Sequence, residues 1–195
     1  PFNGNAKDES GNNNDGEVKG PTLTTGHDGK ENGAYKFSHG DDYIDIPNHP
    51  SLHLTNSMTI SLWLKFDSFH SAQTSNWILS KAWSEGDDRN SQIRHGLEMR
   101  TSGYKNRDAI MTGRFQMPEA LMYKTGEGPA KGGLTKHGIP FSKLPLKKFF
   151  QVTSTYDGEY FRHYMDGELI AQSNKWEGSL EASKGNLQIG QIKGL

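Results

Sequence analysis

Hydrophobic and polar residues alternate most regularly between residues 147 and 173. One alternating run begins at Phe150 and ends at Asp157-Gly158. A second run, residues 160–165, leads directly into Asp166-Gly167. Asp-Gly suits a tight turn, because glycine takes positive φ without a Cβ clash and aspartate can hydrogen-bond the local backbone. The pattern therefore predicts three consecutive antiparallel strands joined by two hairpin turns.

Similar patterns predict short strands along most of the chain and no strong amphipathic helix. The expected strands are residues 34–37, 43–46, 59–66, 77–81, 96–100, 109–115, 149–155, 160–165, 168–172 and 186–190. Four apolar residues in these strands are expected to face the interior, namely Ile60, Leu62, Val152 and Ile189. Trp63, in a core strand, is expected to be a packing residue. His163 is expected on the solvent side of its hairpin, between Arg162 and Tyr164.

The composition is that of one β-rich domain. The chain has 195 residues, enough for a single β-sandwich to bury most of its apolar surface. It contains 23 glycines and only 32% hydrophobic residues, which fits many short strands joined by long polar loops. The first segment, residues 3–33, is rich in Asn, Asp and Gly and is expected to form a short strand followed by turns. We therefore expect a single domain over residues 1–195.

Charge, cysteine content and hydropathy exclude several classes of function. The formal net charge is -1, and no run of lysine and arginine supplies the basic patch that nucleic-acid binding by counterion release requires. The absence of cysteine excludes thiol catalysis, disulfides and zinc–thiolate sites. The eight histidines form no metal-ligating motif. No apolar run approaches the roughly 20 residues of a membrane helix, and no signal peptide is visible.

Four segments carry a resemblance to a known family. Residues 155–158 (TYDG) and 164–170 (YMDGELI) contain its two turn signatures, while residues 35–47 and 58–65 (MTISLWLK) match earlier strands. On these segments the chain resembles the laminin G-like jelly-roll domains of the concanavalin A-like lectin/glucanase superfamily. The resemblance covers nearly the whole chain and implies an all-β fold, an antiparallel two-sheet jelly-roll sandwich. It also implies an extracellular or cell-surface location.

The chain departs from the family pattern at its end. In that family a further strand follows the segment that corresponds to residues 187–190, whereas this chain ends at Leu195. Residues 2–6 (FNGNA) and 8–11 (DESG) resemble the opening motif of the family, and the chain begins at Pro1, directly inside it. We therefore expect that the terminal strand is missing and that the chain is a piece of a larger, multidomain protein.

An oxygen-rich loop near the start of the chain suggests a calcium site. Calcium takes six to eight oxygen ligands, and residues 8–16 combine Asp, Asn and Ser side chains with glycine. The resemblance implies a structural calcium ion, with Asp8 and Asn12 as the first candidate ligands and Asp41 and Asp42 in reserve. An Asx-turn loop without metal is the alternative. Asp41 and Asp42 are adjacent in a strand and point to opposite faces, so they are expected to cap a turn or join a polar network.

The sequence also suggests a carbohydrate site. Sugar rings stack on aromatic side chains while their hydroxyl groups hydrogen-bond polar side chains. Trp83 lies in a polar stretch that is expected to be a loop, and Tyr104 lies in the next expected loop. The predicted carbohydrate-binding residues are Trp83, Tyr104, Asp87, Arg89, Glu98 and Arg100. Residues 116–146 form a long irregular connection, a kind of segment that often carries function.

The signals for catalysis are weaker. Glucanases of this superfamily carry E-x-D-x-x-E on one strand, which places acidic residues on one face, and this chain lacks the motif. Residues 97–100 (LEMR) resemble part of the R-x-E-x-R strand of jelly-roll alginate lyases, in which Glu98 and Arg100 would share the face opposite Leu97 and Met99. The tyrosine-bearing strand of those lyases, Y-F-K-x-G-x-Y, is absent.

The sequence therefore predicts a non-catalytic carbohydrate-binding or adhesion module that recognises a polysaccharide, a glycan or a protein surface. Two alternatives stay open: a protein–protein adhesion or structural spacer domain, and a jelly-roll polysaccharide lyase.

Overall fold

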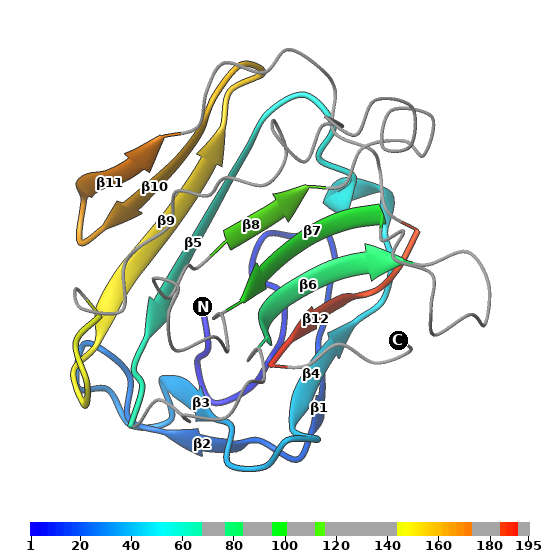
Figure 1. The fold of residues 1–195 in the computed structure, drawn as a ribbon. Helices are drawn as coiled ribbons and strands as arrows, with labels where there is room; N and C mark the ends of the chain where they lie inside the picture. Colours follow the sequence, from blue (N-terminus) through cyan, green and yellow to red (C-terminus); the bar gives the residue numbers. More distant parts are fainter. Residues whose placement is uncertain (68–76, 84–94, 101–111, 116–143, 173–183, 191–195) are drawn as a thin grey trace.

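Two antiparallel sheets and a separate strand pair make up the described part of the chain (Figure 1). The computed structural model describes residues 1–67, 77–83, 95–100, 112–115, 144–172 and 184–190, and for residues 77, 82–83, 95–100, 112–115 and 171 it describes the backbone. The strands are β1 Glu17–Lys19, β2 Thr22–Thr24, β3 Ala34–Lys36, β4 Tyr43–Ile46, β5 Met58–Leu64, β6 Trp77–Trp83, β7 His95–Arg100, β8 Thr112–Phe115, β9 Phe150–Tyr156, β10 Phe161–Met165, β11 Glu168–Gln172 and β12 Leu187–Ile189. A 3-10 helix, Pro50–Leu52, is the one helical element within these residues.

The predicted meander forms most of the four-stranded sheet, whose order is β11-β10-β9-β5. Both Asp-Gly turns adopt the expected backbone, since φ is 84° at Gly167, 99° at Gly158 and 50° at Asp166. The Asp166 carboxylate also accepts a hydrogen bond of 2.8 Å from the backbone N–H of Gln151, which ties the second turn to the start of β9. The local sequence therefore determines this part of the fold.

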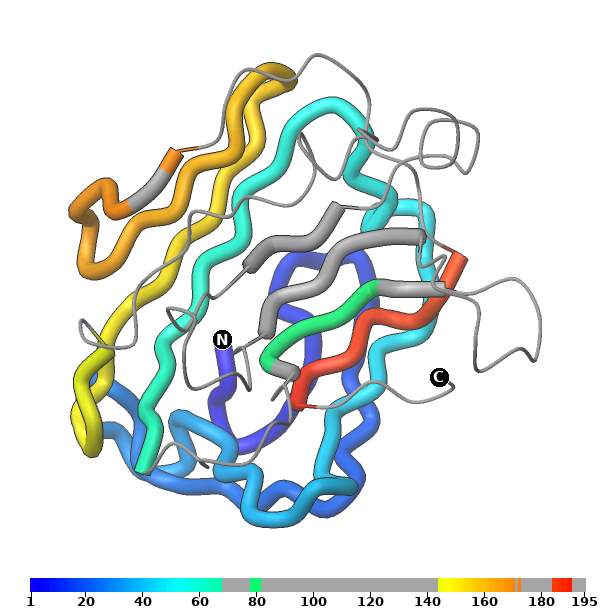
Figure 2. The backbone as a smooth tube through the Cα atoms, viewed as in Figure 1, coloured from blue at the N-terminus to red at the C-terminus, as the bar shows by residue number. Residues whose placement is uncertain are grey.

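The six-stranded sheet has the order β1-β4-β12-β6-β7-β8. Figure 2 shows the last described strand, β12, running between β4 from the first part of the chain and β6 from the middle. The cross-strand register aligns Ile44 with Ile189 and Ile189 with Leu79. Leu79 belongs to the cluster that contains Phe150 and Val152 of the other sheet, and Leu187, which shares a face with Ile189, packs against it, so this row lies on the core side of the sheet.

The core lies between the inner faces of the two sheets, as expected for a jelly-roll sandwich. Phe150 and Val152 of the four-stranded sheet are fully buried and share one cluster with Ile78 and Leu79 of the six-stranded sheet. A second cluster contains Tyr156 and Phe161, whose rings stack with centroids 4.3 Å apart. The prediction of an inward position is confirmed for Val152 and for the partly buried Ile60 and Leu62, which pack against the first cluster. Ile189 is half-buried and in register with the buried Ile44 and Leu79, but it belongs to neither cluster.

Two predictions about single residues were wrong. Trp63 is 45% exposed, because β5 turns its even-numbered residues inward and places Trp63 on the outer face opposite Gln151. His163 is 2% exposed, because it occupies the inward position between Phe161 and Met165 on β10. In both cases the polarity of the side chain suggested one face, and strand alternation imposed the other.

Element boundaries differ from the predictions by a few residues. The opening segment forms two short strands, β1 and β2, in place of the single strand expected there. Strand β6 extends to Trp83, which was expected in a loop. Of the long connection at residues 116–146, residues 116–143 lie outside the described part of the chain.

Candidate functional site

A row of polar residues crosses the six-stranded sheet on the face opposite the core. These positions are direct cross-strand partners of one another, in the order Glu17, Asp45, Gln188, Ser80, Glu98 and Arg114. Because strand positions alternate between faces, the row one residue away from Ile44, Ile189 and Leu79 along each strand belongs to the outer face. The row is buried at Ser80 (2% exposed) and becomes accessible towards Glu17.

Hydrogen bonds fix the middle of this polar row. The Asp45 carboxylate accepts one bond of 3.0 Å from the side-chain amide of Gln188 and one of 2.9 Å from that of Asn186. The amide oxygen of Asn186 in turn accepts a bond of 3.0 Å from the backbone N–H of Asn48. Asp45 and Gln188 are half-buried and Asn186 is exposed. The result is a pre-organised set of planar carboxylate and amide groups, which suits hydroxyl-bearing ligands.

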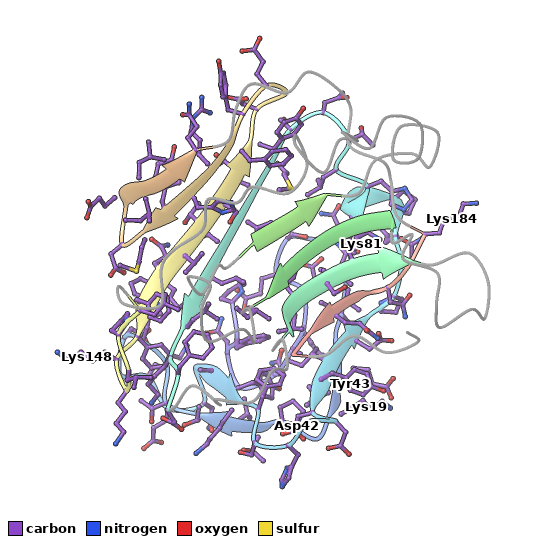
Figure 3. The ribbon with its side chains drawn as sticks, viewed as in Figure 1. Lys19, Asp42, Tyr43, Lys81, Lys148 and Lys184 are labelled. Atoms are coloured by element: carbon purple, nitrogen blue, oxygen red, sulfur yellow. The ribbon has the colours of Figure 1, made fainter. Side chains whose placement is uncertain are left out.

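Lys81 anchors one end of β6. Its ammonium donates hydrogen bonds of 2.7 Å to the side-chain oxygen of Asn48 and to the carbonyl of Gly185. Lys81 is only 6% exposed, and burial lowers its pKa below the ordinary value. Figure 3 shows Lys81 at the end of the sheet near Lys184, away from Lys19, Asp42 and Tyr43 at the opposite end of β4. The lysine therefore ties β6 to the segments that flank β4 and β12.

The predicted carbohydrate-binding residues are placed only in part. Trp83 is the last residue of β6, in register with His95, whereas Glu98 is in register with Ser80 and Arg100 with Trp77. Strand alternation assigns the Trp83 position to one face of the sheet and the Glu98 and Arg100 positions to the other. The remaining members of the set lie outside the described residues, namely Tyr104, Asp87 and Arg89.

The opening loop is organised around Asp8. Oδ1 of Asp8 accepts a 2.8 Å bond from the backbone N–H of Ser10, while Oδ2 accepts bonds from the Ser10 hydroxyl (2.8 Å) and the backbone N–H of Asn14 (2.9 Å). These bonds, led by the Ser10 N–H, lower the pKa of Asp8 to about 2. The side-chain amide of Asn12 donates to the same Ser10 hydroxyl. Three of the roughly four lone-pair positions of the Asp8 carboxylate are therefore already used.

Asp42 organises a separate turn. Its Oδ2 accepts bonds from the backbone N–H groups of Ser38 (2.6 Å) and His39 (2.9 Å), and the His39 bond is the main reason that its pKa is lowered. Asp42 is 4% exposed and Asp41 is exposed, so Asp42 caps the turn before β4 as expected. Within the described residues, His, Cys, Asp and Glu form no group of three or more that could hold a metal ion.

Two further pairs of side chains stand out only in the folded structure. The imidazole of His27 stacks on the indole of Trp63, with centroids 4.0 Å apart and an interplanar angle of 9°. Inside the core, Nδ1 of His163 lies 2.8 Å from the hydroxyl of Ser154, and burial lowers the pKa of His163 to about 4. The sequence contains no signal for the first pair, since its members are 36 residues apart and belong to separate predicted elements.

Two packed antiparallel sheets define a β-sandwich of the jelly-roll type. A laminin G family profile, described as the concanavalin A-like lectin/glucanases superfamily, matches residues 38–194. The chain therefore belongs to the concanavalin A-like lectin/glucanase superfamily. No curated protein matches the chain by sequence.

Solved structures with the same fold include carbohydrate-bound domains. The chain is similar to domain 4 of the extracellular arabinanase AbnA from Geobacillus stearothermophilus in complex with arabinotriose, with a TM-score of 0.60, 14% identity and coverage of 96% of this chain and 78% of that one. It is also similar to the botulinum neurotoxin serotype D ligand-binding domain in complex with N-acetylneuraminic acid, with a TM-score of 0.58, 16% identity and coverage of 96% and 41%.

The botulinum neurotoxin serotype G binding domain gives a TM-score of 0.57 at 13% identity, with coverage of 96% of this chain and 41% of that one. The chain thus spans about two fifths of the length of these toxin domains. Within the described residues, no helix combines the length and the apolar character needed to cross a bilayer.

Proposed function

We propose that this domain is a non-catalytic carbohydrate-binding module of an extracellular multidomain protein. The observation that carries the proposal is the hydrogen-bonded polar row on the outer face of the six-stranded sheet, centred on Asp45 and Gln188. Two solved structures with this fold contain a bound saccharide, and one of them comes from an extracellular enzyme, which supports both parts of the proposal.

The chemistry of the row favours hydroxyl groups as ligands. A sugar hydroxyl both donates and accepts, and the row offers carboxylate acceptors at Asp45 together with amide donors and acceptors at Gln188 and Asn186. Because these groups already hold one another in place, little side-chain freedom is lost when a ligand binds. Glu98 is the cross-strand partner of Ser80 and therefore extends the proposed site along the same row. Arg100 lies two residues further along β7.

Trp83, Tyr104, Asp87 and Arg89 stay in the proposal as contacts predicted from the sequence. By strand alternation the Trp83 position shares the face of Leu79, opposite that of Glu98, and it lies at the other end of β6 from Trp77, the partner of Arg100. In the proposal these residues therefore contact different parts of an extended ligand instead of one flat patch.

The test is a glycan array followed by calorimetric titration of each hit. Gln188→Ala removes an amide that bonds Asp45, and it should weaken binding by roughly 2- to 12-fold, the equivalent of about 0.5–1.5 kcal/mol per hydrogen bond. Gln172→Ala is the matched control, because Gln172 is an exposed glutamine on β11 of the other sheet. If no glycan binds, the adhesion or spacer alternative replaces this proposal. Release of unsaturated products from a uronate polymer would instead favour the lyase alternative.

A structural calcium ion at the opening loop is a second part of the proposal. Asp8 has a pKa of about 2 and is therefore a carboxylate at neutral pH, and Asn12 and Asp15 contribute further oxygen atoms to the same loop. Asp8 has room for about one more bond, so calcium would draw its remaining ligands from backbone carbonyls and water.

A further inference from the structure

An exposed tryptophan lies on the four-stranded sheet, away from the polar row on the six-stranded sheet. Trp63 is 45% exposed on the outer face of β5. An aromatic side chain buries about 150–250 Å² when it is fully covered, so on the order of 100 Å² of this residue is open to solvent. A large apolar surface in this position has no packing role towards the core, which lies on the other side of the strand.

The indole is held in place by its neighbours. His27 stacks on it in parallel at 4.0 Å, and His27 itself is exposed. Gln151 is the direct cross-strand partner of Trp63 on β9. A ring that is supported on one side keeps its orientation, so a ligand that stacks on its open surface loses little conformational entropy of the protein.

The side chains beside the indole are uncharged and hydrogen-bonded to one another. The amide of Gln151 donates a 3.0 Å bond to the hydroxyl of Ser61, and that hydroxyl lies 3.0 Å from the hydroxyl of Thr153. The nearest cation along the strand on this face, Lys65, lies over the ring of Phe149 at 5.0 Å. Next to the apolar surface there is thus a fixed row of two hydroxyl groups and an amide.

An apolar ring beside neutral hydrogen-bonding groups is complementary to an uncharged sugar ring, which has an apolar face and an edge of hydroxyl groups. A sialic acid or uronate would bring a carboxylate, but Gln151, Ser61 and Thr153 are uncharged, and Lys65 on the same face is engaged with the Phe149 ring. A protein surface is less favoured because the apolar area is that of a single residue, far below the roughly 800 Å² per partner of a standard interface.

We propose that Trp63, supported by His27, forms a stacking platform for one ring of a neutral oligosaccharide, with Gln151, Ser61 and Thr153 as hydrogen-bonding partners of its hydroxyl groups. The inference rests on the proposed carbohydrate-binding function, but it assigns a contact on the four-stranded sheet that is distinct from the polar row on the six-stranded sheet.

The experiment compares wild-type protein with Trp63→Ala, Trp63→Phe and Leu169→Ala by calorimetry against arabinotriose, xylotetraose, cellotetraose and mannotetraose, and on an array that also carries acidic glycans. Trp63→Ala should weaken binding to the neutral oligosaccharide about tenfold or more, which corresponds to about 1.4 kcal/mol. Trp63→Phe should retain part of the affinity. Leu169 is a matched control, because it is 48% exposed and lies on β11, separated from β5 by two strands.

Several outcomes would separate this inference from the proposed function. If a neutral glycan binds and Trp63→Ala leaves its affinity unchanged while Gln188→Ala lowers it, the platform is wrong and carbohydrate binding stands. Binding to acidic glycans alone also overturns the platform but not the function. If no glycan binds, both fail. The melting temperature of each variant shows whether a loss of binding reflects unfolding, and rescue by Trp63→Phe supports a stacking role.

Discussion

Substitution of His163 by glutamine should remove most of the acid sensitivity of folding in the range between neutral pH and about pH 4. His163 is 2% exposed and lies against the hydroxyl of Ser154 inside the sandwich. Burial disfavours the charged imidazolium and lowers the pKa from 6.5 to about 4. The folded protein therefore keeps this histidine neutral under conditions in which the unfolded chain protonates it.

The sign and size of the effect follow from this difference. Between the two pKa values the unfolded state binds more protons, so the free energy of unfolding falls as the pH falls below 6.5. Near pH 4 the loss amounts to about 3 kcal/mol at 1.36 kcal/mol per pKa unit, and it levels off below that pH. Above pH 6.5 His163 contributes no pH dependence. A loss of this size is a large share of the 5–15 kcal/mol that is typical of a domain.

The assay is denaturant unfolding at a series of pH values from 7.5 to 4.5. This window lies above the range in which Asp8, with its pKa lowered from 3.8 to about 2, loses its own contribution as the pH falls. His163→Gln lowers stability at pH 7.5 through lost packing, so the slope against pH is the quantity to compare. His49→Gln, at an exposed histidine, should leave that slope unchanged. An unaltered slope in His163→Gln would refute the reasoning.

Three other predictions concern stability. Gly190→Ala should lower the free energy of unfolding by roughly 2–4 kcal/mol, because φ is 95° there and a Cβ would lie 2.5 Å from the Phe37 ring. The control Gly29→Ala, at φ 82° with no atom near the Cβ position, should cost only about 1 kcal/mol in the same denaturant titration. Lys81→Met should cost about 1–3 kcal/mol, measured in the same way, since the oxygens of Asn48 and Gly185 lose a donor, and an unchanged midpoint would contradict this role. If the opening loop binds calcium, added calcium should raise the melting temperature and a chelator should reverse the rise, with Asp8→Asn abolishing both shifts; identical melting curves would favour the metal-free turn.

The sequence by itself determined the features that depend on short stretches of chain. The strand–turn–strand pattern from β9 to β11 needed only period-two alternation and two Asp-Gly pairs, and φ at Asp166 and Gly167 is positive, as those turns require. The turn that Asp42 caps is equally local, since its partners are Ser38 and His39. Such interactions span a few residues, so the sequence contains all the information that they need.

Only the tertiary structure decided which residues meet across the sheets and which face each side chain takes. Gln188 reaches Asp45 because β12 inserts beside β4, although the two residues are 143 positions apart. Alternation in β5 and β10 predicts two faces but does not say which one is covered. Packing of the larger apolar set, with Leu62 and Phe161 inward, then turned Trp63 to the solvent and drew His163 into the core. Burial of the whole strand outweighs the preference of one residue, because each inward apolar side chain contributes about 1.5–3 kcal/mol.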